Sequence, residues 1–207
     1  YYGNDLYDNL MPDLRGYRKP FVRETKEDGG WEIVSSHVTA ERWPLVTEGR
    51  IEGQNHLPRL GEICSETFLS GRVFSACEYL LQAGKELCQQ VDARLVIVSV
   101  PDAYQLTAAG RQTLKTLAGD PDSFDARRPD KGVEAISKRL AIEFVAGESF
   151  LDISSYKTND CHWNEKGHRE VAKMLWHLKA SRRQSAYTSG PEPTPSGRLR
   201  PMESSAV

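Results

Sequence analysis

The sequence predicts an α/β protein: a three-layer α/β/α sandwich in which a sheet lies between two layers of helices. Residues 68–90 carry apolar side chains at helical spacing, and the β-branched run Leu95–Val100 follows, ended by Pro101. A short continuous run of this kind is typical of a strand buried on both faces, as in a parallel sheet. The subsequent order of helices, strand and helix favours the same class.

The N-terminal part is predicted to hold few regular elements. The opening YYGNDLYDNL places Gly3-Asn4-Asp5 after two aromatic residues, a pattern that indicates the end of a buried strand. Two strand-like runs flank Asp28-Gly29-Gly30, so we expect a charged, peripheral β-hairpin over residues 20–38. The prolines and glycines of residues 11–20 and 39–61 predict loops.

The remaining elements follow from the same periodicities. Further helices are expected over residues 106–117 and 132–140, and a second short buried strand over Phe150–Ile153. A last helix is predicted over residues 164–179, with Asn164 as its N-cap.

Residues 1–180 are therefore interpreted as one α/β domain, incomplete at its N-terminal side. Two or three sheet strands are expected in it, whereas an average sheet has about five strands. Residues 181–207 are polar, aperiodic and rich in proline, glycine and serine, which predicts a disordered tail.

The amino-acid composition limits which kinds of partner are expected. The 27 basic and 29 acidic residues nearly cancel, so nucleic acid is not expected as a partner. The longest apolar run is too short to span a membrane. The four cysteines form no Cys-x-x-Cys pair, so a zinc ribbon and a thioredoxin motif are not supported. Compartment and oligomeric state remain open.

The chemistry-bearing stretch is Asn159-Asp160-Cys161-His162-Trp163-Asn164-Glu165-Lys166-Gly167-His168. Asp160 and His162 are two positions apart, and such residues project to the same side of an extended loop. A carboxylate there can accept the imidazole Nδ1 hydrogen and stabilise the imidazolium formed when Nε2 takes a proton. Two alternatives are an ordinary capping or surface pair, and a zinc site of Asp160, His162 and His168.

Together, Gly3-Asn4-Asp5 and the Asp160-x-His162-Trp163-Asn164-x-x-Gly167-His168 block resemble the SGNH (GDSL-type) hydrolase family, which has a flavodoxin-like fold. The resemblance implies that Asn4 is an oxyanion-hole donor, His162 the general base and Asp160 its orienting carboxylate. Gly3 would allow the substrate to approach the backbone closely. Asn159 stays open as the alternative partner of His162, because the commoner family spacing is one residue longer.

The same resemblance implies a serine nucleophile in a Gly-Asp-Ser turn upstream of the Asn block, and this sequence contains no Gly-Asp-Ser. Ser65, Ser70, Ser75 and Ser99 fall in helical or strand contexts, so no nucleophile is assigned and the segment that holds it is expected before Tyr1. No metal or organic cofactor is expected.

The expected function is thus that of part of a bacterial serine esterase, which cleaves acyl esters of small molecules or saccharides, O-acetyl groups among them. The chain by itself is expected to be inactive. The alternative is a non-catalytic module of the same fold that binds a saccharide or a protein.

Overall fold

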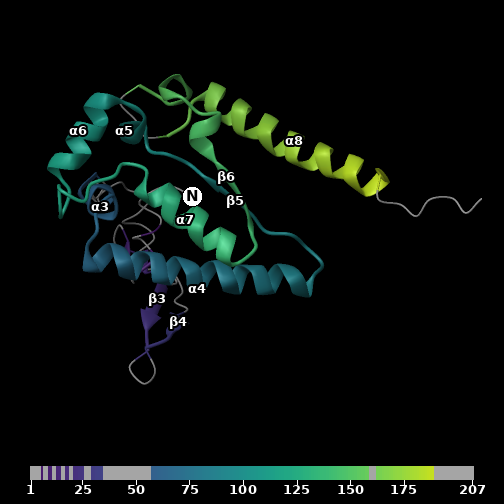
Figure 1. Cartoon of the computed structure of the whole chain (residues 1–207), viewed down its shortest axis with the longest axis horizontal. Coiled ribbons are helices and arrows are strands. Elements are labelled where there is room, and N and C mark those ends of the chain that lie inside the picture. Colours follow the sequence, from purple (N-terminus) through teal and green to yellow (C-terminus); the bar gives the residue numbers. More distant parts are fainter. Residues whose placement is uncertain are drawn as a thin grey trace, which may run out of the picture. The chain divides into compact units, whose positions relative to one another are not determined.

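The computed structural model describes residues 6, 9–10, 13–14, 17–18, 21–25, 29–34, 57–158 and 162–188 (Figure 1). The chain divides into two compact units, Tyr1–Val171 and Ala172–Val207. Helix α8 (Glu165–Thr188) begins in the first unit and continues into the second.

The first unit contains a parallel pair of strands. Strands β5 (Val96–Ser99) and β6 (Glu143–Ala146) pair in register, with Val96 opposite Glu143 and Ser99 opposite Ala146. Since three helices separate the two strands in sequence, this is a β-helix-β crossover. With its antiparallel pairs described below, the structure is of mixed α/β class, as predicted.

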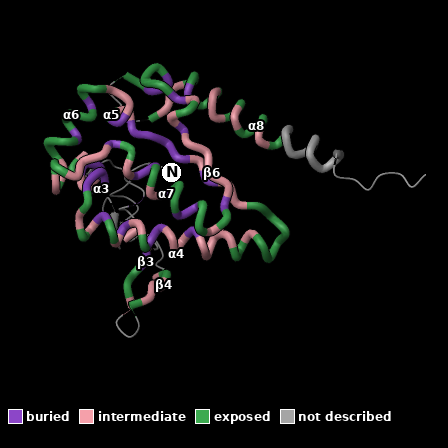
Figure 2. Tube along the Cα trace, in the orientation of Figure 1, coloured by how far each residue is buried: buried purple, intermediate pink, exposed green. Residues whose placement is uncertain are grey.

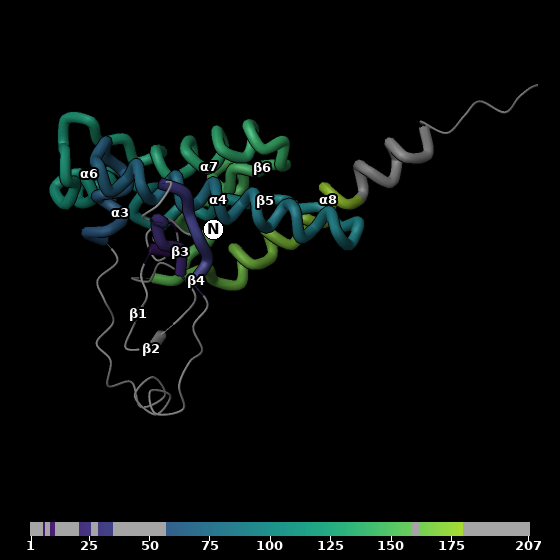
Figure 3. Tube along the Cα trace, turned by 90° about the horizontal axis from the view of Figure 1, so that it is seen from below, coloured from purple at the N-terminus to yellow at the C-terminus, as the bar shows by residue number. Residues whose placement is uncertain are grey.

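Two long helices cover one face of this sheet. Helix α4 (Phe68–Gln90) packs on α7 (Arg128–Arg139), and α7 packs on both strands. Figure 1 shows α7 between α4 and the strands, and Figure 3 again shows α4 beside α7. Between these elements lies the main core, whose buried members are Leu6, Ile63, Val73, Cys77, Leu81, Ile97, Val133, Ile136 and Ile142.

Strand β5 was predicted to be buried on both faces, and this is wrong in detail. Ile97 and Ser99 are buried, whereas Val96 and Val98 on the opposite face are half-buried (Figure 2). The reason is that, among the described elements of the first unit, α4 and α7 cover the face that holds Ile97.

The second sheet strand was predicted at the wrong place. Phe150–Ile153 is not a strand; β6 lies earlier, and Gly147–Ser149 (η1) and Ile153–Ser155 (η2) form short 3-10 turns. Asp152 caps η2, since its carboxylate accepts from the Ser154 N–H at 2.9 Å. Leu151 is buried, but in a cluster beyond the end of the sheet.

Of the three shorter helices, two were not predicted. Residues 57–61, predicted as loop, belong to α3 (Leu57–Ile63), while residues 39–56 lie outside the described residues. The helix predicted over 106–117 is confirmed as α6 (Ala108–Thr116), and a further short helix that was not predicted, α5 (Ala103–Leu106), precedes it. Thr107 separates them because its hydroxyl caps α6 through the Gly110 N–H, at 3.0 Å.

The hairpin is confirmed where it is described, because β3 (Phe21–Glu24) and β4 (Trp31–Val34) pair antiparallel. Within the segment predicted as loop, β1 (Asp13–Leu14) and β2 (Tyr17–Arg18) form a minimal antiparallel pair. Helix α8 extends to Thr188, beyond the predicted start of the tail at residue 181.

Candidate functional site

The edge of the sheet where β5 and β6 end is the natural place for a site. In open α/β sheets, ligands bind outside the carboxyl ends of the strands. Here β5 leads into Pro101 and Asp102, and β6 leads into Gly147 and Glu148.

A buried hydrogen-bonded group joins the two strand ends. The Ser99 hydroxyl accepts from the Gly147 N–H at 3.3 Å and donates to the carboxylate of Asp130, in the first turn of α7. Burial raises the pKa of Asp130, an effect that the Ser99 hydrogen bond opposes. A Cβ atom at Gly147 would lie 2.2 Å from the Ser99 carbonyl oxygen, so only glycine fits here.

The loop that carries His162 is fastened to this same edge. The Tyr156 hydroxyl donates to the Pro101 carbonyl oxygen, directly beyond β5. Tyr156 also pairs with Trp163 in an isolated antiparallel bridge, and the Lys157 N–H donates to the His162 carbonyl oxygen at 3.0 Å. The backbone of His162 is therefore held, while its side chain is exposed.

Asn164 is the centre of this loop's hydrogen bonding. Its Nδ2 donates to the Ser154 carbonyl at 2.8 Å and to the Tyr156 carbonyl at 2.9 Å. Its Oδ1 accepts from the Gly167 N–H at 3.1 Å, which confirms the prediction that Asn164 caps the last helix. One side chain thus joins the loop before His162 to the helix after it.

Gly167 and His168 complete the structural part of the block. A Cβ atom at Gly167 would lie 2.4 Å from the Ser155 carbonyl oxygen and 3.0 Å from the Cβ of Trp163. The His168 ring meets the Trp163 ring edge-on, with centroids 5.4 Å apart. Trp163, Asn164, Gly167 and His168 therefore shape the loop that presents His162.

A second carboxylate in this region is committed to an ion pair. Lys166 Nζ lies 2.9 Å from Asp152 Oδ2, and the Ser154 hydroxyl donates to Asp152 Oδ1 at 2.5 Å. The hydrogen bonds from Ser154 and then Lys166 lower the pKa of Asp152 to about 2. Through Lys166, Asp152 is bound to the first turn of α8.

Of the residues predicted for the site, His162 is the one that the structure describes. The described residues do not include Gly3, Asn4, Asn159 and Asp160. Asp160 is also the carboxylate of the zinc alternative. Leu6, two positions after Asn4, is 1% exposed and packs in the cluster that contains Ile97 of β5. Among the described residues, no group of three potential metal ligands is gathered.

The hydroxyl groups of the four serines singled out in the sequence each donate a hydrogen bond to a structural partner. Ser65, Ser70 and Ser75 donate to backbone carbonyls of the same or the preceding turn, and Ser99 donates to Asp130. Burial, and next the neighbouring Asp125, raises the pKa of the Cys64 thiol to about 12. Because the thiolate is the reactive form, Cys64 is a structural residue.

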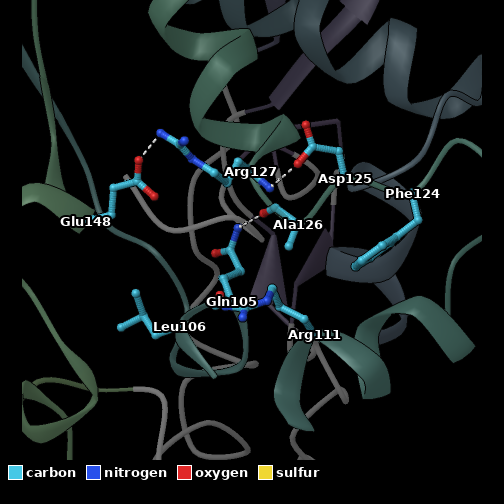
Figure 4. Close-up of a pocket in the computed structure, with 8 residues that line it drawn as sticks. All are labelled: Gln105, Leu106, Arg111, Phe124, Asp125, Ala126, Arg127 and Glu148. Carbon is cyan, nitrogen blue, oxygen red and sulfur yellow. Dashed lines mark hydrogen bonds and ion pairs between the residues drawn. The ribbon is translucent and has the colours of Figure 1, made fainter. Parts of the chain in front are cut away.

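Sequence reasoning missed a cavity of about 460 Å³ at this edge. Figure 4 shows Phe124 on one side of it and Glu148 with Leu106 on the other. Gln105 forms part of the wall: its Oε1 accepts from the Asp102 N–H and its Nε2 donates to the Ala126 carbonyl, both at 2.6 Å. These residues come from distant segments, so only the Asp102–Gln105 capping pair had a local signal.

Comparison with known protein families found no matching family model, and comparisons with curated proteins and with solved structures found no significant match. Within the part of the chain that the structure describes, no helix is long and apolar enough to cross a membrane.

Proposed function

We propose that this chain is part of a serine esterase of the SGNH type, with a flavodoxin-like three-layer sandwich, that acts on acyl esters. His162 is the general base, Asp160 its orienting carboxylate and Asn4 a donor to the oxyanion, with Gly3 leaving room beside it. O-acetyl groups of saccharides are the substrates that we favour.

One observation carries the proposal: the attachment of the His162 loop to the carboxyl edge of the sheet. The hydrogen bond from Tyr156 to the Pro101 carbonyl ties the loop to the end of β5, and Asn164 holds both of its flanks. This is the edge at which α/β enzymes place their catalytic groups. A loop fixed by several hydrogen bonds suits a base that must keep its position during the reaction.

In the proposed reaction, His162 removes the proton from a serine hydroxyl as the oxygen attacks the ester carbonyl. The charge that develops on the carbonyl oxygen is stabilised by donors such as the Asn4 amide. Collapse expels the alcohol, which takes the proton from His162, and water then hydrolyses the acyl-enzyme with His162 again as base. Because the sequence contains no Gly-Asp-Ser turn, the proposal assigns no serine nucleophile among its 207 residues.

The test compares 4-nitrophenyl acetate hydrolysis by this chain and by a longer protein that includes a Gly-Asp-Ser segment. We expect turnover by the longer protein alone. In that protein, His162→Ala should lower kcat by at least about a thousandfold, and Asn4→Ala by about a hundred- to a thousandfold.

His177→Ala, at an exposed position of α8, is the matched control and should leave kcat unchanged. Undiminished turnover by the folded His162→Ala variant would reject the proposed base. Turnover by the 207-residue chain alone would reject the need for an outside serine. A longer protein that binds acetylated saccharides without turnover would favour the non-catalytic alternative.

A further inference from the structure

The cavity at the sheet edge has the features of a preformed binding site. We call it the Arg127 cavity. It is lined by the charged residues Arg111, Asp125, Arg127 and Glu148 and by Gln105, Leu106, Phe124 and Ala126 (Figure 4). Its volume, about 460 Å³, lies within the range of small-molecule sites.

Separate clusters anchor its two apolar walls. Phe124 packs against the cluster of Leu60, Cys64 and Leu114, whereas Leu106 packs against the cluster of Val100, Leu151 and Tyr156. The walls are therefore held in place without a ligand. Phe124 adds an aromatic ring to the lining, a group against which the C–H face of a sugar ring can pack.

The charges around the cavity are balanced. Arg127 forms an ion pair with Glu148, and Asp125 pairs with Lys131 at 2.6 Å. Arg111 donates to the Gln105 carbonyl oxygen at 3.1 Å and keeps further N–H groups. Donors and acceptors thus stand side by side, an arrangement that matches hydroxyl groups, which both donate and accept. Two arginines and two carboxylates line the cavity, so it carries no net charge that would favour a polyanion over a neutral ligand.

The cavity and the His162 loop border the same packed cluster. Leu106 lines the cavity and packs on the cluster of Val100, Leu151 and Tyr156, and Trp163, the neighbour of His162, packs on that cluster too. The cavity and the loop are therefore anchored on one and the same cluster.

We propose that the Arg127 cavity binds a neutral saccharide, as the subsite for the sugar that carries the ester. Its role as a subsite rests on the proposed function, whereas saccharide binding itself does not require turnover.

The test measures binding of xylotriose to the 207-residue chain by isothermal titration calorimetry. We expect Arg127→Ala and Phe124→Leu each to raise Kd about tenfold or more. Arg139→Ala is the matched control and should leave Kd unchanged, because Arg139 is not among the residues that line the cavity. Like Arg127, it forms an ion pair with a glutamate, Glu78, at 2.6 Å, and its side chain is 56% exposed against 59% for Arg127. Circular dichroism melting verifies that each variant is folded; should Arg127→Ala unfold, Arg111→Gln takes its place.

Equal Kd values for the Arg127 and Arg139 variants, absence of xylotriose binding, or tighter binding of trigalacturonic acid would each overturn the proposal. If the longer protein proves inactive on esters but xylotriose binding still depends on Arg127, the proposed function fails and the saccharide site stands. If the longer protein is an active esterase but xylotriose binding does not depend on Arg127, the proposed function stands and the saccharide site fails.

Discussion

Asp130 places a carboxyl group in the interior, at the start of a helix and against the Ser99 hydroxyl. Proximity to the helix N-terminus favours the ionised form, whereas burial and the nearby Glu148 disfavour it, and Arg127 counteracts them in part. The net pKa is raised, so burial outweighs the favourable contacts. The group that joins the two strand ends therefore has a stability that depends on pH.

The sign of this dependence follows from the raised pKa. Between the ordinary pKa of an aspartate and the higher pKa in the folded state, the folded protein binds more protons than the unfolded one. The contribution of Asp130 to stability is thus greatest at low pH and is lost as pH rises through the folded-state pKa. In Asp130→Asn this loss is absent, so the free energy of unfolding of the variant, relative to the parent, should rise with pH from 3.5 to 7.

Urea denaturation at several pH values measures this difference. Asp122→Asn, at an exposed turn position, is the control for the same change of side chain at the surface. A pH-independent difference for Asp130→Asn would contradict the assignment.

At the scale of elements, the His162 loop shows how a sequence block can be mostly structural. Asn164 caps α8 and holds two carbonyls of the preceding segment, and Gly167 lets the helix approach the Ser155 carbonyl. These residues belong to a block that resembles one of a catalytic family, and their contacts show that they shape the loop.

Gly167→Ala tests this role of the loop. The new methyl group would meet the Ser155 carbonyl, so we expect a loss of about 1–3 kcal/mol of unfolding free energy. Gly71→Ala, on an open face of α4, is the matched control and should raise stability by up to about 1 kcal/mol through helix propensity. Equal changes in the free energy of unfolding for the two substitutions, measured by urea denaturation, would show that the approach of Gly167 to the Ser155 carbonyl does not affect stability.

The elements that were predicted well have strong local signals. The apolar period of residues 68–90 and the β-branched run that follows correspond to α4 and β5. Strand β6 was missed because Glu143–Ala146 is short and half-buried, whereas Phe150–Ile153 is more apolar. The glycine of η1 and the cap at Asp152 are what turn that apolar stretch into irregular structure.

At the scale of the first unit, one core joins α4, α7, β5 and Leu6. Ile136 is 2% exposed within it. Because removing buried methyl groups leaves a cavity, Ile136→Ala should cost about 2–5 kcal/mol and Ile136→Val about 0.5–1.5 kcal/mol.

Urea unfolding followed by circular dichroism and by tryptophan fluorescence measures both costs. The two signals should move together if this core unfolds as one unit. Leu117→Ala, at a site 37% exposed, should have a much smaller effect than Ile136→Ala. Separate transitions for the two signals would show that the core is not cooperative.

The sequence by itself determined the helix over 68–90, the strand that ends before Pro101, the hairpin, the cap at Asn164 and the spacing of Asp160 and His162. Each of these depends on neighbours a few positions away, through periodicity, capping or turn chemistry. Tertiary structure alone decided that β5 pairs with Glu143–Ala146, that Tyr156 ties the His162 loop to Pro101, and that Arg127 meets Glu148 at a cavity. These contacts join residues far apart in the chain, and they form only because burial of a shared core brings those segments together.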